Sequence, residues 1–267
     1  MVKILDGKKL SSELAQKLKK IIEKLKIKPK LVIIQVGDNA RSMSYIKRKI
    51  IFAEKIGALV EHKKNPENIS ETTLIASIRR FNADKSAHGI IVQLPLPKHI
   101  DTRRVSETID YEKDVDGFRG HFMPATARGI LTLLDKYKVK ISGQKVVVVG
   151  RSEFVGKPIA LALLNREATV TICHKRTRDL AREIKDADIL VIAAGHPKLI
   201  KSGHVNKNQV IIDVGINILK DRKVTGDVDF KNVSKVVKAI SPVPGGVGPM
   251  TIASLFQNLL EAYSLQA

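Results

Sequence analysis

The sequence predicts an α/β protein of two lobes, each with a mostly parallel sheet flanked by helices, and with a cleft between the lobes. Short apolar runs bounded by glycine, such as Val146–Val149 before Gly150, are typical of strands buried on both faces. These runs alternate with segments whose apolar residues recur at helical spacing. Because parallel strands need crossover connections, this alternation predicts parallel βαβ units.

The first half of the chain alternates helices with short strands. The strand candidates are apolar, whereas the helix candidates are longer and carry their apolar residues on one face. Helices are expected at about 8–26, 42–57 and 71–82, strands at 31–36 and 89–94, and an extended segment near 58–63.

The second half follows the same pattern after Pro124. The valine run at 145–149 is its clearest strand, because an unbroken β-branched run suits a strand buried on both faces. The other elements are expected as helices at about 126–137, 156–166, 177–186 and 250–264, and as strands at 168–173, 189–194 and 210–214.

Two interruptions divide the chain. Asp110–Pro124 is rich in charged residues, and Ser241–Pro249 contains three prolines and three glycines. Loops at domain junctions often carry function. We therefore expect a catalytic lobe over residues 1–119, a dinucleotide-binding lobe over 120–248, and a final helix, 249–267, that returns to the first lobe.

Composition narrows the function class. Cys173 is the single cysteine, the N-terminus lacks an apolar signal-peptide core, and no apolar run approaches the roughly 18 residues of a membrane span. We expect a cytoplasmic protein with no membrane partner. The formal net charge of +20 is compatible with nucleic-acid binding. No aromatic residues interleave with the lysines of residues 1–30 as a stacking platform would need, so we expect an anionic small molecule and no nucleic acid.

A glycine turn follows the valine strand. Gly150 ends the strand and Gly156 opens the next helix, and unpaired N–H groups at a helix N-terminus favour an anion. Ser152 replaces the second glycine of the usual dinucleotide fingerprint, so an ordinary strand–helix turn is the alternative. The pattern predicts that a dinucleotide binds at this turn.

The end of the following strand indicates which dinucleotide binds. NAD-binding folds hold the ribose hydroxyl with an acidic residue about 20 residues past the glycine turn. Here that region contains Lys175 and Arg176 and no carboxylate, and both cations would attract a 2′-phosphate. We expect NADP, and the alternative is that both cations face solvent.

Polar residues of the first lobe suggest a catalytic cluster. Tyr45 and Lys49 are four residues apart in a predicted helix and share one face. A lysine desolvated in a cleft has a lowered pKa and can act as a base or donor near neutrality. Gln93 stands at the carboxyl end of an apolar strand, where ligands bind in parallel sheets. Asp116 precedes Gly117 and is either a turn residue or an acceptor for an amino-pyrimidine edge.

Eight segments stand out along nearly the whole chain. They are VGDNARSMSYIKRK (36–49), GIIVQLPLP (89–97), KDVDGF (113–118), VVVVGRSEFVGKP (146–158), ATVTICH (168–174), DVGIN (213–217), GDVDF (226–230) and PGGVGPMT (244–251). Together, and in this order, they resemble the methylenetetrahydrofolate dehydrogenase/methenyltetrahydrofolate cyclohydrolase family.

The resemblance implies two reactions in one site. NADP oxidises 5,10-methylenetetrahydrofolate to the methenyl form, and water opens the methenyl form to 10-formyltetrahydrofolate. It implies that Lys49 is the catalytic lysine with Gln93 as its partner, that Tyr45 stacks near the folate, and that Asp116 anchors the pterin. The second lobe would be a Rossmann-like NADP-binding domain, and the family suggests a homodimer. The basic surface suits a folate that carries a polyglutamate tail.

The resemblance also implies binding residues in both lobes, and it implies no metal. Those of the folate site would be Val92, Leu94, Pro244, Gly245, Gly246, Val247 and Gly248. Those of the cofactor site would be Gly150, Arg151, Ser152, Lys175, Arg176 and Ile216, with Lys175 near the 2′-phosphate and Ile216 towards the nicotinamide.

Three features depart from the family pattern. Only five residues separate Phe118 from Pro124, a shorter connection than is usual in the family. Pro124–Ala127 reads PATA where PCTP is common, and Lys175 stands where many members have serine. A relative with one of the two activities is therefore one alternative, and a basic nucleic-acid-binding protein that retains the fold is another.

Overall fold

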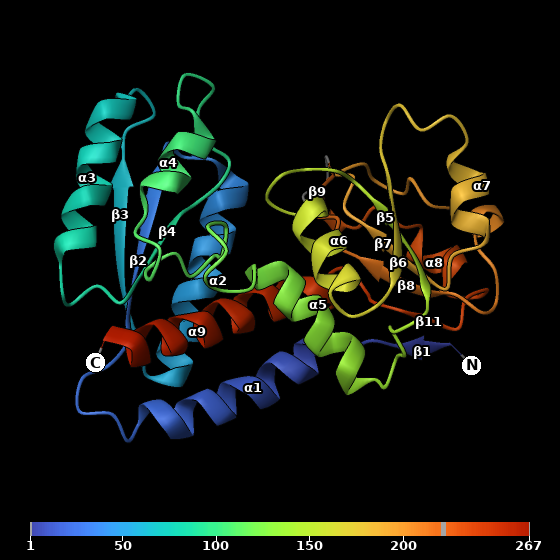
Figure 1. Cartoon of the computed structure of the whole chain (residues 1–267), viewed down its shortest axis with the longest axis horizontal. Helices are drawn as coiled ribbons and strands as arrows, with labels where there is room; N and C mark the ends of the chain where they lie inside the picture. The colour runs from blue at the N-terminus through green and yellow to red at the C-terminus, as the bar shows by residue number, and fades with distance from the viewer. Residues whose placement is uncertain (1, 220–222, 267) are drawn as a thin grey trace. The chain divides into compact units, whose positions relative to one another are not determined.

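The computed structural model describes residues 2–219 and 223–266, which form two compact units (Figure 1). The three-stranded unit consists of Ser12–Ala125 and the segment from Ile252 onwards, and the six-stranded unit consists of the segment up to Ser11 and Thr126–Thr251. Met1 and Ala267, the ends of the expected lobes, lie outside the described residues.

The three-stranded unit is built on a parallel sheet. β2 (Lys30–Val36) lies between β3 (Leu59–Asn65) and β4 (Gly89–Val92). The stretch Leu31–Ile34 is completely buried, because helices cover both faces of the sheet. Ile90 of β4 also forms an isolated parallel bridge with Asp114, which fixes the start of the segment that contains Asp116.

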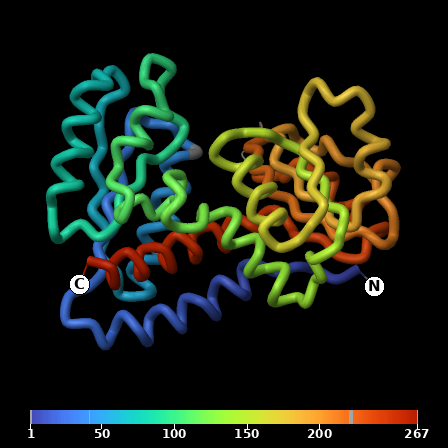
Figure 2. The backbone as a smooth tube through the Cα atoms, in the orientation of Figure 1, coloured from blue at the N-terminus to red at the C-terminus, as the bar shows by residue number. Residues whose placement is uncertain are grey.

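The helices of this unit form two cores, one on each face of the sheet. Leu31 and Ile33 of β2 face one core, and Val32 and Ile34 face the other. Figure 2 shows the last helix, in red, returning to the elements of the first half of the chain. The first core is formed with α1 (Gly7–Ile22), α2 (Ala40–Ile56) and α9 (Val247–Gln266), and the second with α3 (Glu71–Ala83) and α4 (Thr102–Thr108).

The six-stranded unit contains the second parallel sheet, whose strand order is β1-β11-β8-β7-β5-β6. β6 and β7 lie on opposite sides of β5, so the chain changes direction across the sheet at β5, and such a switch point is where open α/β sheets bind ligands. Its strands are β1 (Lys3–Ile4), β5 (Lys145–Val149), β6 (Thr169–Cys173), β7 (Ile189–Ile192), β8 (Val210–Asp213) and β11 (Ala239–Ile240).

Shorter elements complete this unit. β9 (Asn217–Ile218) and β10 (Val224–Thr225) form a separate antiparallel pair. One face of the main sheet packs its residues against α7 and α8. The helices are α5 (Ala125–Lys136), α6 (Gly156–Leu164), α7 (Leu180–Lys185), the 3₁₀ helix η1 (Ser202–His204) and α8 (Phe230–Val233).

The expected α/β class with mostly parallel sheets is confirmed, but several boundaries differ. The first helix ends at Ile22 instead of residue 26, and the carbonyl of Ile22 accepts from Leu25 N at 3.1 Å and from Lys28 Nζ at 2.9 Å. The helix expected from 177 begins at Leu180, because the Asp179 side chain caps it by accepting from Arg182 N. The short helix α4 was not expected.

The bounds of the two units also differ from those expected from sequence. The N-terminal segment up to Ser11 groups with the six-stranded unit, because β1 pairs with β11 at the edge of that sheet. The other divisions fall at Ala125/Thr126 and Thr251/Ile252. A two-residue strand such as Lys3–Ile4 has no periodicity that a sequence can display.

Candidate active site

A buried lysine and a glutamine from neighbouring elements meet in the three-stranded unit. Lys49 lies in α2 and is 6% exposed, and its Nζ donates to Gln93 Oε1 at 3.0 Å. Gln93 Nε2 donates to the Leu94 carbonyl at 2.9 Å, which turns the amide oxygen towards the lysine. The Gln93 backbone N–H donates to Ile34 O at 2.8 Å, so the sheet itself positions this residue.

Asp116 interacts electrostatically with Lys49. Burial lowers the pKa of Lys49, and the charge of Asp116 opposes that shift. Burial likewise raises the pKa of Asp116, and the charge of Lys49 opposes it. A desolvated lysine exchanges its proton closer to neutral pH than a lysine in water does. The Lys49 amine, beside the Asp116 carboxyl group, is therefore suited to proton transfer.

The segment that carries Asp116 is fixed by buried side chains on both sides. Asp114 Oδ2 accepts from Arg119 N at 2.7 Å. Asn258 of α9 is fully buried, and its Nδ2 donates to Val115 O at 2.8 Å and to Met123 O at 3.0 Å. Because these bonds hold the main chain before and after Asp116, the position of its carboxylate is set by the fold.

The remaining first-lobe candidates lie beside Lys49. Tyr45 is partly buried and lies one helical turn before Lys49 in α2, so the two side chains share a face. Val92 ends β4 and is 4% exposed. The carbonyl of Leu94 also accepts from Ser42 Oγ of α2 at 3.3 Å. The structure thus gathers these residues where α2 passes the carboxyl end of β4.

The loop from Pro244 to Gly248 belongs to the six-stranded unit. It begins with a cis peptide bond between Val243 and Pro244, and Gly245 has a φ of 111°. The Gly245 carbonyl accepts from Lys8 N at 2.8 Å, and Val247 is buried at the start of α9. The loop is therefore a fixed turn, and its contact with folate stays a prediction.

A backbone cradle lies at the carboxyl end of β5. Gly150 has a φ of 131°, and a Cβ there would collide with the carbonyl oxygen of Ala193 after β7. Ser152 stands before α6, where its Oγ accepts from Gly156 N at 3.2 Å and its carbonyl accepts from Lys157 N at 3.0 Å. Arg151 is exposed beside it. The turn brings the chain close to any group at this edge, as a pyrophosphate cradle requires.

Two cations follow the neighbouring strand. Val149 of β5 is in register with Cys173 of β6, so Lys175 and Arg176 follow β6 at the same edge as Gly150. Both are exposed, and their turn is closed by His174, whose N–H donates to Thr177 Oγ1 at 2.9 Å. Exposed cations beside a glycine turn fit a dinucleotide that carries an additional phosphate.

Ile216 follows β8 and is partly buried. The residues around it are held by two buried carboxylates, Asp213 and Asp227, which are 3% and 0% exposed. Burial raises the pKa of Asp213 to about 7, while hydrogen bonds from the backbone N–H groups of Asp227 and Val228 oppose this shift. These two aspartates were not among the residues expected from sequence.

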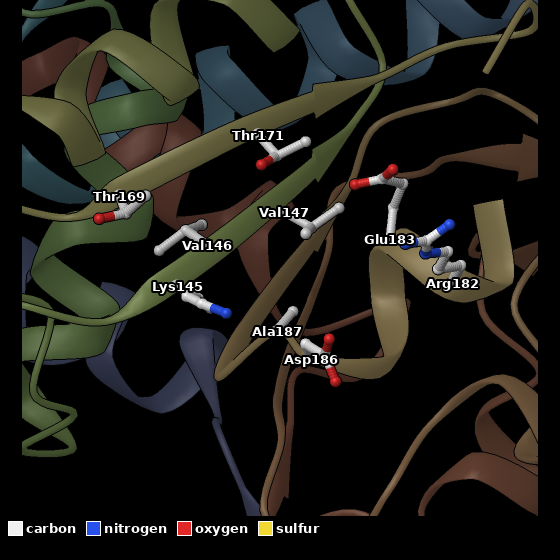
Figure 3. Close-up of a pocket in the computed structure, with 9 residues that line it drawn as sticks. All are labelled: Lys145, Val146, Val147, Thr169, Thr171, Arg182, Glu183, Asp186 and Ala187. Atoms are coloured by element: carbon white, nitrogen blue, oxygen red, sulfur yellow. The ribbon is translucent and has the colours of Figure 1, made fainter. Parts of the chain in front are cut away.

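A pocket of about 290 Å³ lies elsewhere on the six-stranded sheet (Figure 3). The figure shows Arg182 and Glu183 of α7 and Asp186, which follows this helix, around it, together with residues of β5 and β6. Lys145 and Thr169 begin their strands, so this pocket extends towards the amino ends, opposite the edge where parallel sheets bind ligands. It contains none of the residues expected to bind folate or cofactor.

Two further observations concern the described part of the chain. Among residues 2–219 and 223–266, no group of three or more His, Cys, Asp or Glu side chains is placed to hold a metal ion. No helix within these residues is long and apolar enough to cross a membrane.

Several positioning residues escaped the sequence analysis. Asp213 closes the apolar run VIID, and a carboxylate at the end of a buried strand was the available signal. Asp114 and Asp227 stand in the segments KDVDGF and GDVDF, where only Asp116 was singled out. Asn258 gave no signal, because a single amide in an apolar helix resembles a surface residue until the packing is known.

Two family descriptions match the sequence. The family model for the tetrahydrofolate dehydrogenase/cyclohydrolase catalytic domain matches residues 5–116. The model for the NAD(P)-binding domain of the same family matches residues 124–267. Among curated proteins, the Bifunctional protein FolD of Exiguobacterium sibiricum is 46% identical over 276 residues, covering 98% of this chain and 99% of the relative. That of Nautilia profundicola is 44% identical over 273 residues, covering 97% and 96%.

Solved structures resemble the whole chain. The bifunctional methylenetetrahydrofolate dehydrogenase/cyclohydrolase FolD of Campylobacter jejuni has a TM-score of 0.96 and 41% identity and covers 100% of both chains. The Trypanosoma brucei dehydrogenase-cyclohydrolase, solved with NADP and an inhibitor, has a TM-score of 0.94 and 31% identity, and covers 99% of this chain and 98% of that one.

Proposed function

The chain belongs to the tetrahydrofolate dehydrogenase/cyclohydrolase family, and we propose that Lys49, Gln93 and Asp116 carry the chemistry of this family within it. The protein is a bifunctional enzyme of one-carbon metabolism: it oxidises 5,10-methylenetetrahydrofolate with NADP and hydrolyses the methenyl product to 10-formyltetrahydrofolate. The observation that supports the residue assignment is the buried Lys49–Gln93 contact beside Asp116.

The oxidation step requires positioning more than acid or base catalysis. NADP, when bound, accepts the hydride of the methylene bridge. The methenyl cation that remains is delocalised over two nitrogen atoms, so the protein needs to hold the folate in one orientation. We assign this task to Asp116, whose carboxylate accepts from the amino-pyrimidine edge of the pterin, and to Tyr45, whose ring packs against the folate.

The hydrolysis step requires a proton acceptor close to the attacking water. Lys49 serves this role because burial lowers its pKa, which makes the free amine available near neutrality. Gln93 Oε1 accepts a hydrogen bond from the Lys49 amine and so fixes its direction. The amine takes a proton from the water as its oxygen bonds to the methenyl carbon, and it returns that proton to the folate nitrogen when the ring opens.

The cofactor residues are proposed from the cradle at β5. Gly150 allows close approach of the pyrophosphate, and Arg151 and Ser152 contact it. Lys175 and Arg176 bind the 2′-phosphate, which carboxylates at this place would repel. Their exposure and their register beside Gly150 support this assignment.

The test follows both reactions with the purified protein. Methylenetetrahydrofolate with NADP should generate NADPH and then formyl product, and NAD in a parallel reaction should be the weaker oxidant. Lys49→Ala should abolish hydrolysis of added methenyltetrahydrofolate and have a smaller effect on hydride transfer. Lys55→Ala, an exposed lysine on the same helix, is the matched control. Unchanged hydrolysis in Lys49→Ala would contradict the assignment of this lysine.

We also propose a homodimer. β6 is an edge strand of the six-stranded sheet, and Ile172 on it is 41% exposed, while Leu161 and Leu164 of the preceding helix α6 are 58% and 53% exposed. Exposed edges with apolar side chains pair with other chains. Sedimentation should give a dimer for the wild type and a monomer for Leu164→Glu, and a wild-type monomer would exclude this interface.

We also propose which form of folate binds, which kinds of partner do not, and in which compartment the enzyme functions. The basic surface, with a net charge of +20, suits folates with a polyglutamate tail, and we expect no nucleic-acid or membrane partner. The single cysteine, Cys173, is buried and forms no disulfide, which is compatible with an enzyme that functions in the reducing cytoplasm. Fractionation of the producing cell would place the enzyme, and recovery with membranes would contradict the proposal.

A further inference from the structure

Two buried carboxylates of the six-stranded unit hold the loops at the cofactor edge of the sheet. Asp227 Oδ2 accepts from the backbone N–H groups of Ala194 and Gly195 at 2.7 and 2.8 Å. Its other oxygen, Oδ1, accepts from Asn217 Nδ2 at 2.8 Å. Since Ala193 contacts Gly150, Asp227 connects the β7 loop beside the cradle with the loop that follows β8.

Asp213 holds the same loops from the other side. Its Oδ1 accepts from Gly215 N at 2.9 Å and from Asp227 N at 3.0 Å, and its Oδ2 accepts from Val228 N at 2.9 Å. A Cβ on Gly226 would collide with the Asp213 carboxylate, so the segments around Gly226 and Asp213 approach as closely as a glycine allows.

Ile216 lies between two residues that these carboxylates hold. Gly215, before it, donates its N–H to Asp213, and Asn217, after it, donates its side-chain amide to Asp227. Asn217 is buried, and its replacement would leave a carboxylate oxygen without this donor. The fold therefore fixes the backbone on both sides of Ile216 through hydrogen bonds to two buried aspartate side chains.

We propose that Asp213, Asp227 and Asn217 are positioning residues that fix Ile216 at the nicotinamide end of the cofactor site and so set the affinity for NADP. This proposal rests on the proposed function and on the place towards the nicotinamide that the family resemblance implies for Ile216. The three residues do not contact the reacting atoms. They act through the loop after β7, which borders the cradle at Gly150, and through the loop after β8, which Asp227 joins to it.

A swap of the carboxylate and the amide tests the proposal. In Asp227→Asn, an N–H donor faces either Asn217 or the N–H groups of Ala194 and Gly195, and in Asn217→Asp two carboxylates face each other. Each single change should weaken NADP binding, measured by titration calorimetry, about tenfold, as expected when a charge-assisted hydrogen bond is lost. The double variant D227N/N217D restores an amide–carboxylate bond with the same net charge and should recover most of the affinity.

The chain offers a matched control. Asp229 and Asn232 form an exposed pair of the same chemistry, with Asn232 Nδ2 donating to Asp229 Oδ2 at 2.6 Å. Asp229→Asn should leave NADP affinity unchanged. Hydrolysis of added methenyltetrahydrofolate needs no oxidant, so it should stay at the wild-type rate in every variant and thereby reports correct folding.

The outcomes separate this proposal from the function on which it rests. Unchanged NADP affinity in Asp227→Asn, or no recovery in the double variant, would overturn the positioning role. Unchanged affinity in Ile216→Ala would instead overturn the assigned place of Ile216. Should Asp227→Asn not fold, Asn217→Ala removes the donor and leaves the carboxylate, and it should weaken NADP binding with hydrolysis intact; equal loss of both would show a structural role alone.

Discussion

The chemistry that we propose for the three-stranded unit depends on one desolvated charge, that of Lys49. Lys49 is only 6% exposed. Two interactions of its ammonium group offset the cost of this burial: a hydrogen bond to Gln93 and the nearby charge of Asp116. Burial of a charge without a partner would cost several kcal/mol. The result is a lysine whose pKa is lowered but which stays paired, and this balance makes it suitable as a proton carrier.

Removal of the Asp116 charge should move the pH profile of hydrolysis. The charge of Asp116 raises the pKa of Lys49 against the effect of burial, so Asp116→Asn should lower the pKa of Lys49 further. Because the free amine is the active form, the rising limb of kcat for hydrolysis should shift to lower pH at saturating methenyltetrahydrofolate. A limb that stays in place or moves upward would mean that Lys49 is not the titrating group.

At the scale of elements, three helices end in the same backbone motif but with different residues. After α2, Gly57 adopts a φ of 78°, whereas Lys138 after α5 and Glu167 after α6 adopt 56° and 62°. In each case the next residue donates its N–H five residues back, as Val139 does to Leu134 O at 2.9 Å. This is the Schellman end, which favours glycine because other residues are strained at positive φ.

Glycine at these helix ends should stabilise the protein. Lys138→Gly and Glu167→Gly should each raise stability by about 0.5–1 kcal/mol, because they relieve the left-handed strain. Gly57→Ala should lower stability by about 1 kcal/mol, since a Cβ there meets only ordinary contacts, the nearest atom being Ile22 Cγ2 at 3.8 Å. Urea unfolding measures all three, and a lower midpoint for Glu167→Gly would contradict the strain argument.

α9 contributes a second element-scale effect through Asn258. Asn258→Ala leaves the carbonyls of Val115 and Met123 without their donor, which should cost about 1–3 kcal/mol. Because those carbonyls flank Asp116, the KM for folate should rise in both reactions while the KM for NADP stays constant. Ser254→Ala on the same helix is the control, since its buried hydroxyl has no hydrogen-bond partner among the described residues. A fall in kcat alone would show that Asn258 does not position Asp116.

The whole chain carries a charge that no single site explains. A net charge of +20 with a pI near 10 produces a positive field around the molecule that attracts anionic ligands over distances comparable to the Debye length. Folate polyglutamates are long anions, so they sample this field more than a monoglutamate does. We therefore expect the surface to extend substrate recognition beyond the residues that we propose to hold the pterin.

Salt should therefore separate the two substrates. Raising ionic strength from about 0.05 to about 0.3 M shortens the Debye length, and the KM for a pentaglutamate folate should rise several-fold more than the KM for the monoglutamate. Initial rates of NADPH formation at both ionic strengths measure this effect. Equal salt dependence of the two KM values would show that the tail does not use the basic surface.

Many elements of the fold could be predicted from the sequence because each has a local cause. Lys145 and the four valines that follow it predicted β5 with its observed bounds, since burial on both faces requires an apolar run. The α/β class and the membership of the folate family likewise follow from the order of local segments. Lys49 and Gln93 could be named from sequence, but their hydrogen bond joins residues 44 positions apart, and no local pattern encodes that distance.

The sequence by itself determined the α/β class, the glycine turn after β5 and the family, because periodicity, glycine placement and motif order are properties of neighbouring residues. The tertiary structure alone decided which groups hold the site residues in place. Asn258 reaches the Asp116 segment across 143 positions, and Asp227 joins the loops after β7 and β8. Such contacts arise when packed elements bury polar groups that must then find partners, and that requirement exists only in the folded chain.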